Sequence, residues 1–197
     1  MFRDLAHRGT LCEAPPYQVQ SMKKVSLITD GSCLGNPGRG GWACLFRFDG
    51  VKSEEIFGFD PHTTNNRMEL MAPIQGLLAL EELALKEPCE VEITSDSKYV
   101  VQGMTEWISN WKQRRWWLKH GPVLNAYLWI ELDELASLYK PKPTWAWTRG
   151  HADHEDNVRC DLLARNAAAT QQSSWPDGRR HAPLRRNLGV DYVPPKP

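Results

Sequence analysis

Residues 23–42, KKVSLITDGSCLGNPGRGGW, join a short run of β-forming residues to an aspartate and a glycine-rich segment. The run Lys24–Thr29 predicts a strand that ends at Asp30. The glycine-rich segment lacks the lysine of a phosphate-binding P-loop, and it leads into another strand instead of a helix. Its glycines are therefore expected to let the backbone come close to a ligand beside Asp30.

The composition describes one folded domain with tails. The 197 residues include 24 Lys and Arg and 24 Asp and Glu, so a nucleic-acid site must be sought in local clusters of charge. The five cysteines form no C-x-x-C pair, which favours reduced thiols and a cytoplasmic location. No apolar run reaches bilayer length and no apolar leader is present, so neither membrane contact nor export is expected.

The chain divides into three parts. Residues 1–22 contain a Pro-Pro break and predict a loose extension, while residues 171–197 mix prolines with two Arg-Arg pairs and predict a disordered tail. Residues 23–170 carry the periodic patterns of a folded domain.

Within the domain, strands and helices alternate after an initial hairpin. The strands are expected at Lys24–Thr29, Gly41–Phe48, Lys52–Phe59, Glu90–Ser95 and Thr144–Thr148; the helices at Asn65–Leu85, from about 97 to Trp111, Asn125–Leu138 and Asn157–Ala169. The pair Asp49-Gly50 is a strong signal for a hairpin turn. This order indicates an α/β protein with a mixed sheet covered by helices.

Two of the strands run directly into an aspartate, Asp30 in one case and Asp96 in the other. The helical crossover that leads to the second strand favours a parallel arrangement, which would bring both aspartates to the same edge of the sheet. Taken singly, each is better explained as a turn former or helix N-cap. The pair indicates a functional site.

A third carboxylate, Glu69, is expected on the core-facing side of a helix. Its stripe consists of small and apolar residues: Ala72, Pro73, Gly76, Leu80 and Leu83. The alternative is that Glu69 complements the positive end of the helix dipole. Pro73 removes the hydrogen bond to the Glu69 carbonyl and is expected to kink the helix.

A fourth acid, Asp161, shares a helix face with Val158, Ala164 and Ala168. Converging carboxylates repel one another, so either some stay protonated or a metal lies among them. Oxygen ligands suit Mg²⁺ or Mn²⁺. A zinc site built from His151, His154 and Cys160 is the alternative, but it lacks a second pair of ligands.

The segment 107–120, WISNWKQRRWWLKH, combines basic and aromatic residues. A helix core explains Trp107 and Trp111, which are four residues apart, but not the run Arg114-Arg115-Trp116-Trp117. Basic groups beside aromatic rings suit contact with a phosphate backbone and its sugars or bases. This cluster predicts a nucleic-acid partner.

Four motifs in register resemble the bacterial type I ribonuclease H family: ITDGSCLGNPGRGGW, TTNNRMELMA, TSDSKYV and RGHADHEDNVRCDLLAR. The resemblance covers roughly residues 23–170. It implies the ribonuclease H-like fold, a five-stranded mixed sheet whose first three strands are antiparallel, flanked by helices. It also implies an endonuclease that hydrolyses the RNA strand of an RNA–DNA hybrid and leaves 5′-phosphate and 3′-hydroxyl ends.

The resemblance assigns catalysis to Asp30, Glu69, Asp96 and Asp161 with two Mg²⁺ ions, Mn²⁺ being possible. In the family one ion lies between the residues at positions 30 and 161, where water is activated, and the other between those at 30, 69 and 96. His151 matches a histidine thought to assist proton movement or product release. A monomer acting on hybrid duplex is expected.

The resemblance also implies contacts to the hybrid, with strand choice made through RNA 2′-hydroxyls. The expected contact residues are Cys33, Asn36, Thr64, Asn65, Asn66, Lys98, Trp107 and Asn110, together with Lys112, Arg114 and Arg115 of a basic protrusion at 107–122. Thr64 and Asn110 match a DNA-phosphate pocket, and Trp107 matches a wall of the DNA channel.

The chain departs from the family pattern in a few places. His62 replaces a frequent arginine by the phosphate pocket, which predicts a weaker and pH-sensitive contact, and Lys98 replaces a common glutamine. The protrusion has fewer lysines after Arg115, which leaves its hybrid affinity open. Two alternatives are a hybrid-binding module that has lost catalysis and a DNA-strand-transfer enzyme of the same fold. The presence of all four acids and of His151 argues against a module without catalysis. The protrusion and the TTNNRMEL helix argue against a strand-transfer enzyme.

Overall fold

The computed structural model describes residues 22–82, 89–150 and 155–174, together with 182, 184, 188 and 192–196. Except for Met22, the expected N-terminal extension lies outside these ranges. Among the helices so described, none is long and apolar enough to cross a bilayer.

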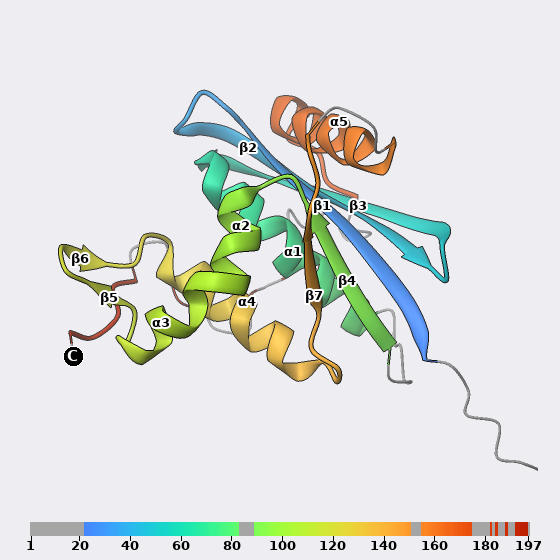
Figure 1. Cartoon of the computed structure of the whole chain (residues 1–197). Coiled ribbons are helices and arrows are strands. Elements are labelled where there is room, and N and C mark those ends of the chain that lie inside the picture. Colours follow the sequence, from blue (N-terminus) through green and yellow to red (C-terminus); the bar gives the residue numbers. More distant parts are fainter. Residues whose placement is uncertain are drawn as a thin grey trace, which may run out of the picture.

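Strands and helices alternate after the first hairpin as expected (Figure 1). The strands are β1 (Lys23–Leu34), β2 (Gly38–Phe48), β3 (Val51–Thr63), β4 (Cys89–Ser95), β5 (Trp117–Leu118), β6 (Gly121–Pro122) and β7 (Thr144–Trp147). The helices are α1 (Asn65–Glu82), α2 (Lys98–Gln102), the π-helical turn η1 (Gly103–Trp107), α3 (Ile108–Gln113), α4 (Ala126–Leu138) and α5 (Glu155–Thr170).

The antiparallel part of the main sheet comprises β1, β2 and β3. Asp49 and Gly50 connect β2 to β3 and have φ values of 49° and 83°. Two consecutive left-handed residues form a tight hairpin turn, because the twist of such a turn matches the twist of the two strands. The expectation that the first strand ends at Asp30 is wrong, because β1 continues to Leu34 while Asp30 pairs with Ala43 of β2.

The parallel part of the sheet places the acids. β4 pairs with β1, and the last pair in this ladder is Thr29 with Ser95. β7 pairs in parallel with β4, which gives the sheet order β3-β2-β1-β4-β7. Asp30 and Asp96 each follow the last residue of the β1–β4 ladder, so the two lie side by side at the carboxyl edge, as predicted.

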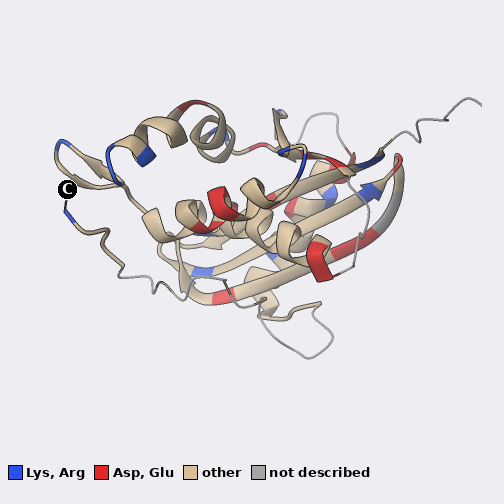
Figure 2. Ribbon diagram, turned by 90° about the horizontal axis from the view of Figure 1, so that it is seen from below, with Lys and Arg blue, Asp and Glu red and all other residues tan. Residues whose placement is uncertain are grey.

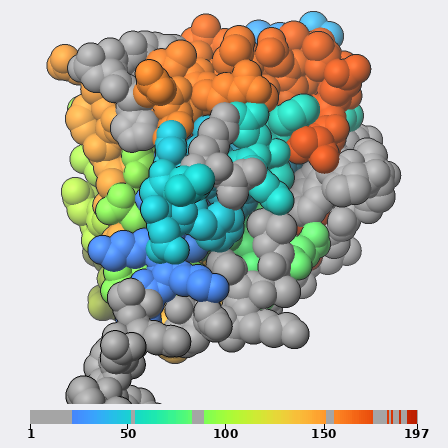
Figure 3. Space-filling view, turned by 90° about the vertical axis from the view of Figure 1, so that its right-hand side faces the viewer, coloured from blue at the N-terminus to red at the C-terminus, as the bar shows by residue number. Residues whose placement is uncertain are grey.

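Helices cover both faces of the sheet. α1 packs on β1 and β2, with α4 behind it (Figure 1). α5 packs on the opposite face against β1, β2 and β3 (Figures 1 and 3). The alternation of strand side chains produces this division: Leu27 belongs to the core beneath α1, and its neighbour Ile28 packs with Cys160 of α5. Cys160 is fully buried there, and its thiol donates to the Ile28 carbonyl at 3.3 Å.

Two glycines of β1 and β2 bring these helices close to the sheet. A Cβ at Gly31 would lie 2.2 Å from the Glu69 backbone nitrogen, and one at Gly41 would lie 2.1 Å from the Ala164 carbonyl oxygen. Protein backbone, not a ligand, therefore occupies the space beside these glycines, and the expectation of a ligand is wrong for both. Gly31 instead lets α1 bring Glu69 beside β1.

The basic protrusion (residues 107–122) begins in a broken helix. The helical segment expected up to Trp111 is present and consists of α2, η1 and α3. A Cβ at Gly103 would lie 2.0 Å from the ring of Trp129, so the missing side chain admits this tryptophan of α4 beneath η1. Trp129 is fully buried and contacts Tyr99 and Trp111 edge to face.

The disorder expected for the C-terminal segment 171–197 stays a prediction, but several of its described residues contact the domain. The Ser174 hydroxyl accepts from the Phe57 backbone N–H at 2.8 Å. Ala182 is 2% exposed, and Leu184, Leu188 and Tyr192 pack against the main core. At these positions the packing of apolar side chains on the core holds the segment, although its overall composition is of low complexity.

Candidate active site

Four acidic residues from four different elements approach the carboxyl edge of the parallel strands. Asp30 is on β1, Glu69 is in the second turn of α1, Asp96 follows β4, and Asp161 is on α5. Asp30 is 8% exposed, whereas the other three are half-buried. The small, buried stripe behind Glu69 is confirmed at Ala72, Pro73, Gly76 and Leu80.

Asp30 is the electrostatic centre of this group. Burial and the nearby charge of Asp96 raise its pKa to about 8, with smaller contributions from Asp161 and Glu69. The Gly31 backbone N–H donates to Asp30 Oδ1 at 2.7 Å and opposes the rise. Glu69, Asp96 and Asp161 therefore all lie within electrostatic reach of Asp30.

Glu69 is held by two hydrogen bonds. Its Oε1 accepts from Asn65 Nδ2 at 2.8 Å, and its Oε2 accepts from the Ser97 hydroxyl at 2.7 Å. Burial, aided by Asp96, raises the Glu69 pKa even though these two bonds oppose the rise. Ser97 also caps α2 by accepting from the Val100 N–H, so one hydroxyl fixes both the helix start and the carboxylate.

Asp96 lies in a tight backbone setting. Its carbonyl accepts from the Trp147 indole N–H at 3.0 Å, and its Oδ2 accepts from Asn157 Nδ2 at 3.4 Å. A Cβ at Gly150 would lie 2.7 Å from that same Oδ2, so a larger residue there would displace the Asp96 carboxylate. Asn157 is 1% exposed and its buried Oδ1 has no hydrogen-bond partner within the described protein.

The donor set suits a hard divalent cation. Asp161 forms an ion pair of 2.8 Å with Arg165, and Glu69 is bonded as described above. Within the described ranges, no three or more His, Cys, Asp or Glu side chains are already arranged to hold a metal. Nevertheless, oxygen-only donors fit Mg²⁺ or Mn²⁺. The repulsion among the acids, which adds to burial in raising the Asp30 pKa, fits them too, because the charge of a cation would relieve it.

His151 and His154 lie outside the described residues, so the role predicted for His151 stays a prediction. The zinc alternative gains nothing from Cys160, which is buried among the apolar side chains of Ile28 and Leu45.

Several of the residues expected to contact the hybrid lie next to the acids. Asn36 Oδ1 accepts from the Asn65 backbone N–H at 3.2 Å, which joins the turn after β1 to the start of α1. The Cys33 thiol reaches the Thr63 carbonyl at 3.5 Å. Thr64 accepts from two N–H groups at the start of α1, and Asn66 is half-buried in the first turn. We call these residues at the turn after β1 and the start of α1 the rim; Asn65 connects it to Glu69.

Lys98 lies on the other side of Asp96, at the start of α2. Its ammonium group is 4.9 Å from the centre of the Trp147 ring, a cation–π contact. Trp147 is 47% exposed. His62 is exposed, and its backbone N–H donates to Asp60 Oδ1.

The remaining expected contacts belong to the protrusion, at the end of the molecule where several basic segments gather (Figure 2). Trp107 packs between Tyr99 and Trp111. Asn110 Oδ1 accepts from Arg114 Nε at 2.9 Å, and Arg114 and Arg115 are exposed. Since Tyr99 is on α2, the stacked rings connect the protrusion to the helix that follows Asp96.

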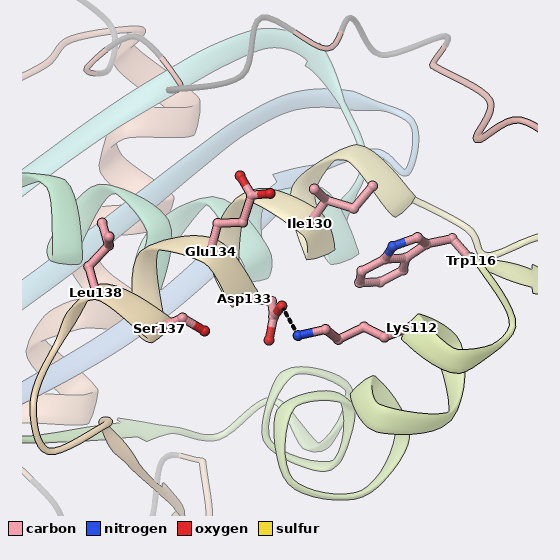
Figure 4. A pocket seen from close by; sticks show the side chains of 7 residues that line it. All are labelled: Lys112, Trp116, Ile130, Asp133, Glu134, Ser137 and Leu138. Atoms are coloured by element: carbon pink, nitrogen blue, oxygen red, sulfur yellow. Dashed lines mark hydrogen bonds and ion pairs between the residues drawn. The ribbon is translucent and has the colours of Figure 1, made fainter.

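A separate pocket lies between α3 and α4 (Figure 4). Its volume is about 550 Å³, and it is lined by Lys112, Trp116, Ile130, Asp133, Glu134, Ser137 and Leu138. Lys112 forms a 2.6 Å ion pair with Asp133 there, so part of its charge is neutralised within the protein. None of the four acids lines this pocket, and it is not the active site.

Sequence reasoning missed three residues that position the acids: Ser97, Trp147 and Asn157. Ser97 could have been found, since a serine directly after a strand-ending aspartate and before a helix is an N-cap signal. Trp147 and Asn157 reach Asp96 from segments 51 and 61 residues away, a proximity that no local pattern encodes.

The mixed sheet, its flanking helices and the carboxylates at its edge define an α/β protein of the nuclease class. The chain belongs to the ribonuclease H family: the family model described as RNase H matches residues 22–169. It is accordingly an endonuclease that hydrolyses the RNA strand of RNA–DNA hybrids.

Relatives support this membership. The chain is 51% identical to the ribonuclease H of Solibacter usitatus over 154 residues, covering 78% of this chain and 100% of the relative. It is 53% identical to that of a Bradyrhizobium species over 146 residues, covering 74% and 90%.

Solved structures share the fold. The crystal structure of LC9-RNase H1, a type 1 RNase H with the type 2 active-site motif, matches with a TM-score of 0.68 and 34% identity, covering 78% of this chain and 76% of that one. LC11-RNase H1 in complex with an RNA/DNA hybrid matches in fold with a TM-score of 0.60 and 23% identity, covering 74% and 97%.

Proposed function

We propose that Asp30, Glu69, Asp96 and Asp161 are the catalytic acids of this hydrolase and that they hold two Mg²⁺ ions, which Mn²⁺ can replace. The observation that carries this proposal is the convergence of Glu69, Asp96 and Asp161 on the buried Asp30, whose pKa is raised to about 8 by burial first and by these three charges in addition. Such a group is far more stable with bound cations than without them.

Each acid has a distinct role in this proposal. Asp30, the most buried, would be a ligand of both ions; Asp161 would be a further ligand of the ion that activates water, and Glu69 and Asp96 would be ligands of the other. When bound, paired divalent cations lower the pKa of an attacking water and stabilise the leaving oxygen of an in-line displacement. The products would carry 5′-phosphate and 3′-hydroxyl ends.

The chain's own residues prepare the acids for this task. Ser97 and Asn65 fix the rotamer of Glu69, and Trp147 and Asn157 fix Asp96. Preorganised ligands reduce the ordering that binding requires. His151 is proposed to assist proton movement or product release.

The hybrid would lie across the rim and the protrusion. The rim at Cys33, Asn36, Asn65, Asn66 and Lys98 would contact the strands near the acids, reading the 2′-hydroxyls of the RNA. Thr64, Trp107 and Asn110, with the basic side chains Lys112, Arg114 and Arg115, would hold the DNA strand by phosphate and aromatic contacts.

A fold neighbour was solved with an RNA/DNA hybrid, which supports the choice of duplex. We further propose that the protein acts as a monomer in the cytoplasm and without a membrane. The five cysteines without a C-x-x-C pair support that compartment.

The test uses 5′-labelled hybrid, double-stranded RNA and double-stranded DNA, each with and without Mg²⁺. The wild-type protein should cut only the RNA strand of the hybrid, and only with Mg²⁺. Asp30→Asn should remain folded and inactive, while Glu92→Gln, which changes an exposed carboxylate on β4, should behave as wild type.

Turnover by Asp30→Asn, with wild-type contamination excluded, would contradict the metal role. Tight hybrid binding without cleavage by the wild-type protein in Mg²⁺ or Mn²⁺ would favour the hybrid-binding module instead.

A further inference from the structure

The C-terminal segment contains two contacts that connect distant parts of the domain. It lies beyond residues 22–169, which match the family model. We call its described residues Ala182, Leu184, Leu188 and 192–196 the C-terminal strap.

The first contact anchors the strap to α1. The Ala182 backbone N–H donates to Gln75 Oε1 at 2.7 Å, and the Ala182 carbonyl accepts from Gln75 Nε2 at 3.1 Å. Gln75 is fully buried in α1, and both polar atoms of its amide bond Ala182, while Nε2 also reaches Met71 Sδ at 3.5 Å. A buried amide satisfied in this two-way manner makes a specific anchor, since loss of the partner would leave polar atoms unpaired.

The second contact reaches the protrusion. The indole N–H of Trp117 donates to the carbonyl of Pro194 at 2.9 Å and to that of Pro195 at 3.1 Å. Pro194 is buried, and Leu184, Leu188 and Tyr192 pack on the main core between the two contacts. Figure 1 shows the chain ending beside β5 and β6.

The hairpin that receives the strap has little support of its own. β5 and β6 pair through two residues each, and such a short isolated ladder is marginal in water. Arg115 and Trp116, directly before β5, both have left-handed backbone angles, with φ of 51° and 66°. A non-glycine residue in this region is strained, so outside contacts must hold the conformation.

We propose that the C-terminal strap positions the β5–β6 hairpin, and with it the basic residues of the protrusion, for the DNA strand of the hybrid. One end is fixed to α1, the helix that carries Glu69, and the other holds Trp117. The strap thereby sets the protrusion relative to the catalytic acids. Trp117 and Gln75 act as positioning residues, and the inference rests on the proposed hybrid contact of the protrusion.

The experiment measures KM and kcat for hybrid cleavage by the full chain and three variants. Truncation after Val193 removes both proline carbonyls, and Trp117→Phe keeps an aromatic ring but removes the donor. Each should raise KM roughly fivefold, the loss typical of one net hydrogen bond. The kcat should stay within about twofold, because the acids are untouched. Val193→Ala, at a position 58% exposed, is the matched control and should change neither value.

Two further readouts separate positioning from general stability. The truncation and Trp117→Phe combined should raise KM no more than either alone, since both remove one interaction. Amide exchange at residues 117–122 should quicken in both variants while exchange in α1 stays the same.

An unchanged KM in both variants would overturn the inference, as would additive effects or an equal loss in kcat. A lower KM after truncation would also overturn it, because it would mean that the strap competes with the hybrid. If the full chain cleaves no hybrid, the proposed function fails; if it cleaves and the variants match it, only the strap inference fails.

Discussion

Replacing Asp30 with asparagine should make the metal-free protein more stable, although it should abolish catalysis. The Asp30 pKa is raised from 3.8 to about 8, chiefly by burial and by Asp96. Between these two pH values the folded state binds a proton that the unfolded state releases, so the stability of the wild-type protein falls as pH rises. Asparagine resembles the protonated acid, and its Oδ1 can still accept from the Gly31 N–H.

The size of the effect follows from the shift. At 1.36 kcal/mol per pH unit, a pKa change from 3.8 to about 8 gives a ceiling of about 6 kcal/mol. Relaxation of the protein and entry of water around a charged Asp30 reduce this ceiling. We therefore expect the free energy of unfolding of Asp30→Asn to exceed that of the wild type by about 2–3 kcal/mol at pH 8.5. At pH 4 the gain should vanish, because the wild-type Asp30 is then protonated in the folded state.

Urea unfolding in EDTA, from pH 4 to 9, measures the difference. Glu92→Gln is the matched control, since this β4 carboxylate is exposed and its removal should give no pH-dependent gain. Added Mg²⁺ should stabilise the wild-type protein at pH 8.5 more than Asp30→Asn. A variant no more stable than wild type at pH 8.5, or a gain that does not grow with pH, would refute the reasoning.

The packing of the site predicts two further outcomes. Gly31→Ala should lower the free energy of unfolding by more than about 3 kcal/mol, because the new Cβ would lie 2.2 Å from the backbone of Glu69. Gly50→Ala should lower it by only about 1–2 kcal/mol, because Gly50 has a φ of 83° but open space around it. Chemical denaturation measures both, and equal costs would argue against the close approach of α1. Ser97→Ala should lose about 1 kcal/mol of helix capping and raise the Mg²⁺ concentration for half-maximal cleavage roughly tenfold. A metal titration of the cleavage rate measures the latter, and an unchanged midpoint would exclude a role for Ser97 in holding Glu69.

Local signals in the sequence were sufficient for most of the fold. The Asp49-Gly50 hairpin was predictable because only a few residue types tolerate two consecutive left-handed positions. The convergence of Asp30 and Asp96 was also predictable, since parallel pairing after a helical crossover fixes the edge at which both strands end.

The predictions that were not met depend on contacts between distant residues. The continuation of β1 to Leu34 depends on pairing with β2, whereas its own residues Gly31 to Cys33 are not strong strand formers. The docking of Ala182 depends on a buried glutamine 107 residues away. No single-sequence pattern reveals this partner in α1, and the composition of the segment gives no signal for it.

The central claim is that the acids around Asp30 bind the divalent cations that cleave the RNA strand. Crystals of the wild-type protein with an uncleavable hybrid and Mn²⁺ test it most directly, through anomalous scattering. We predict two cations within about 2.5 Å of Asp30 oxygens, one also touching Asp161 and the other Glu69 and Asp96. A bound hybrid with no cation at Asp30 would contradict the account.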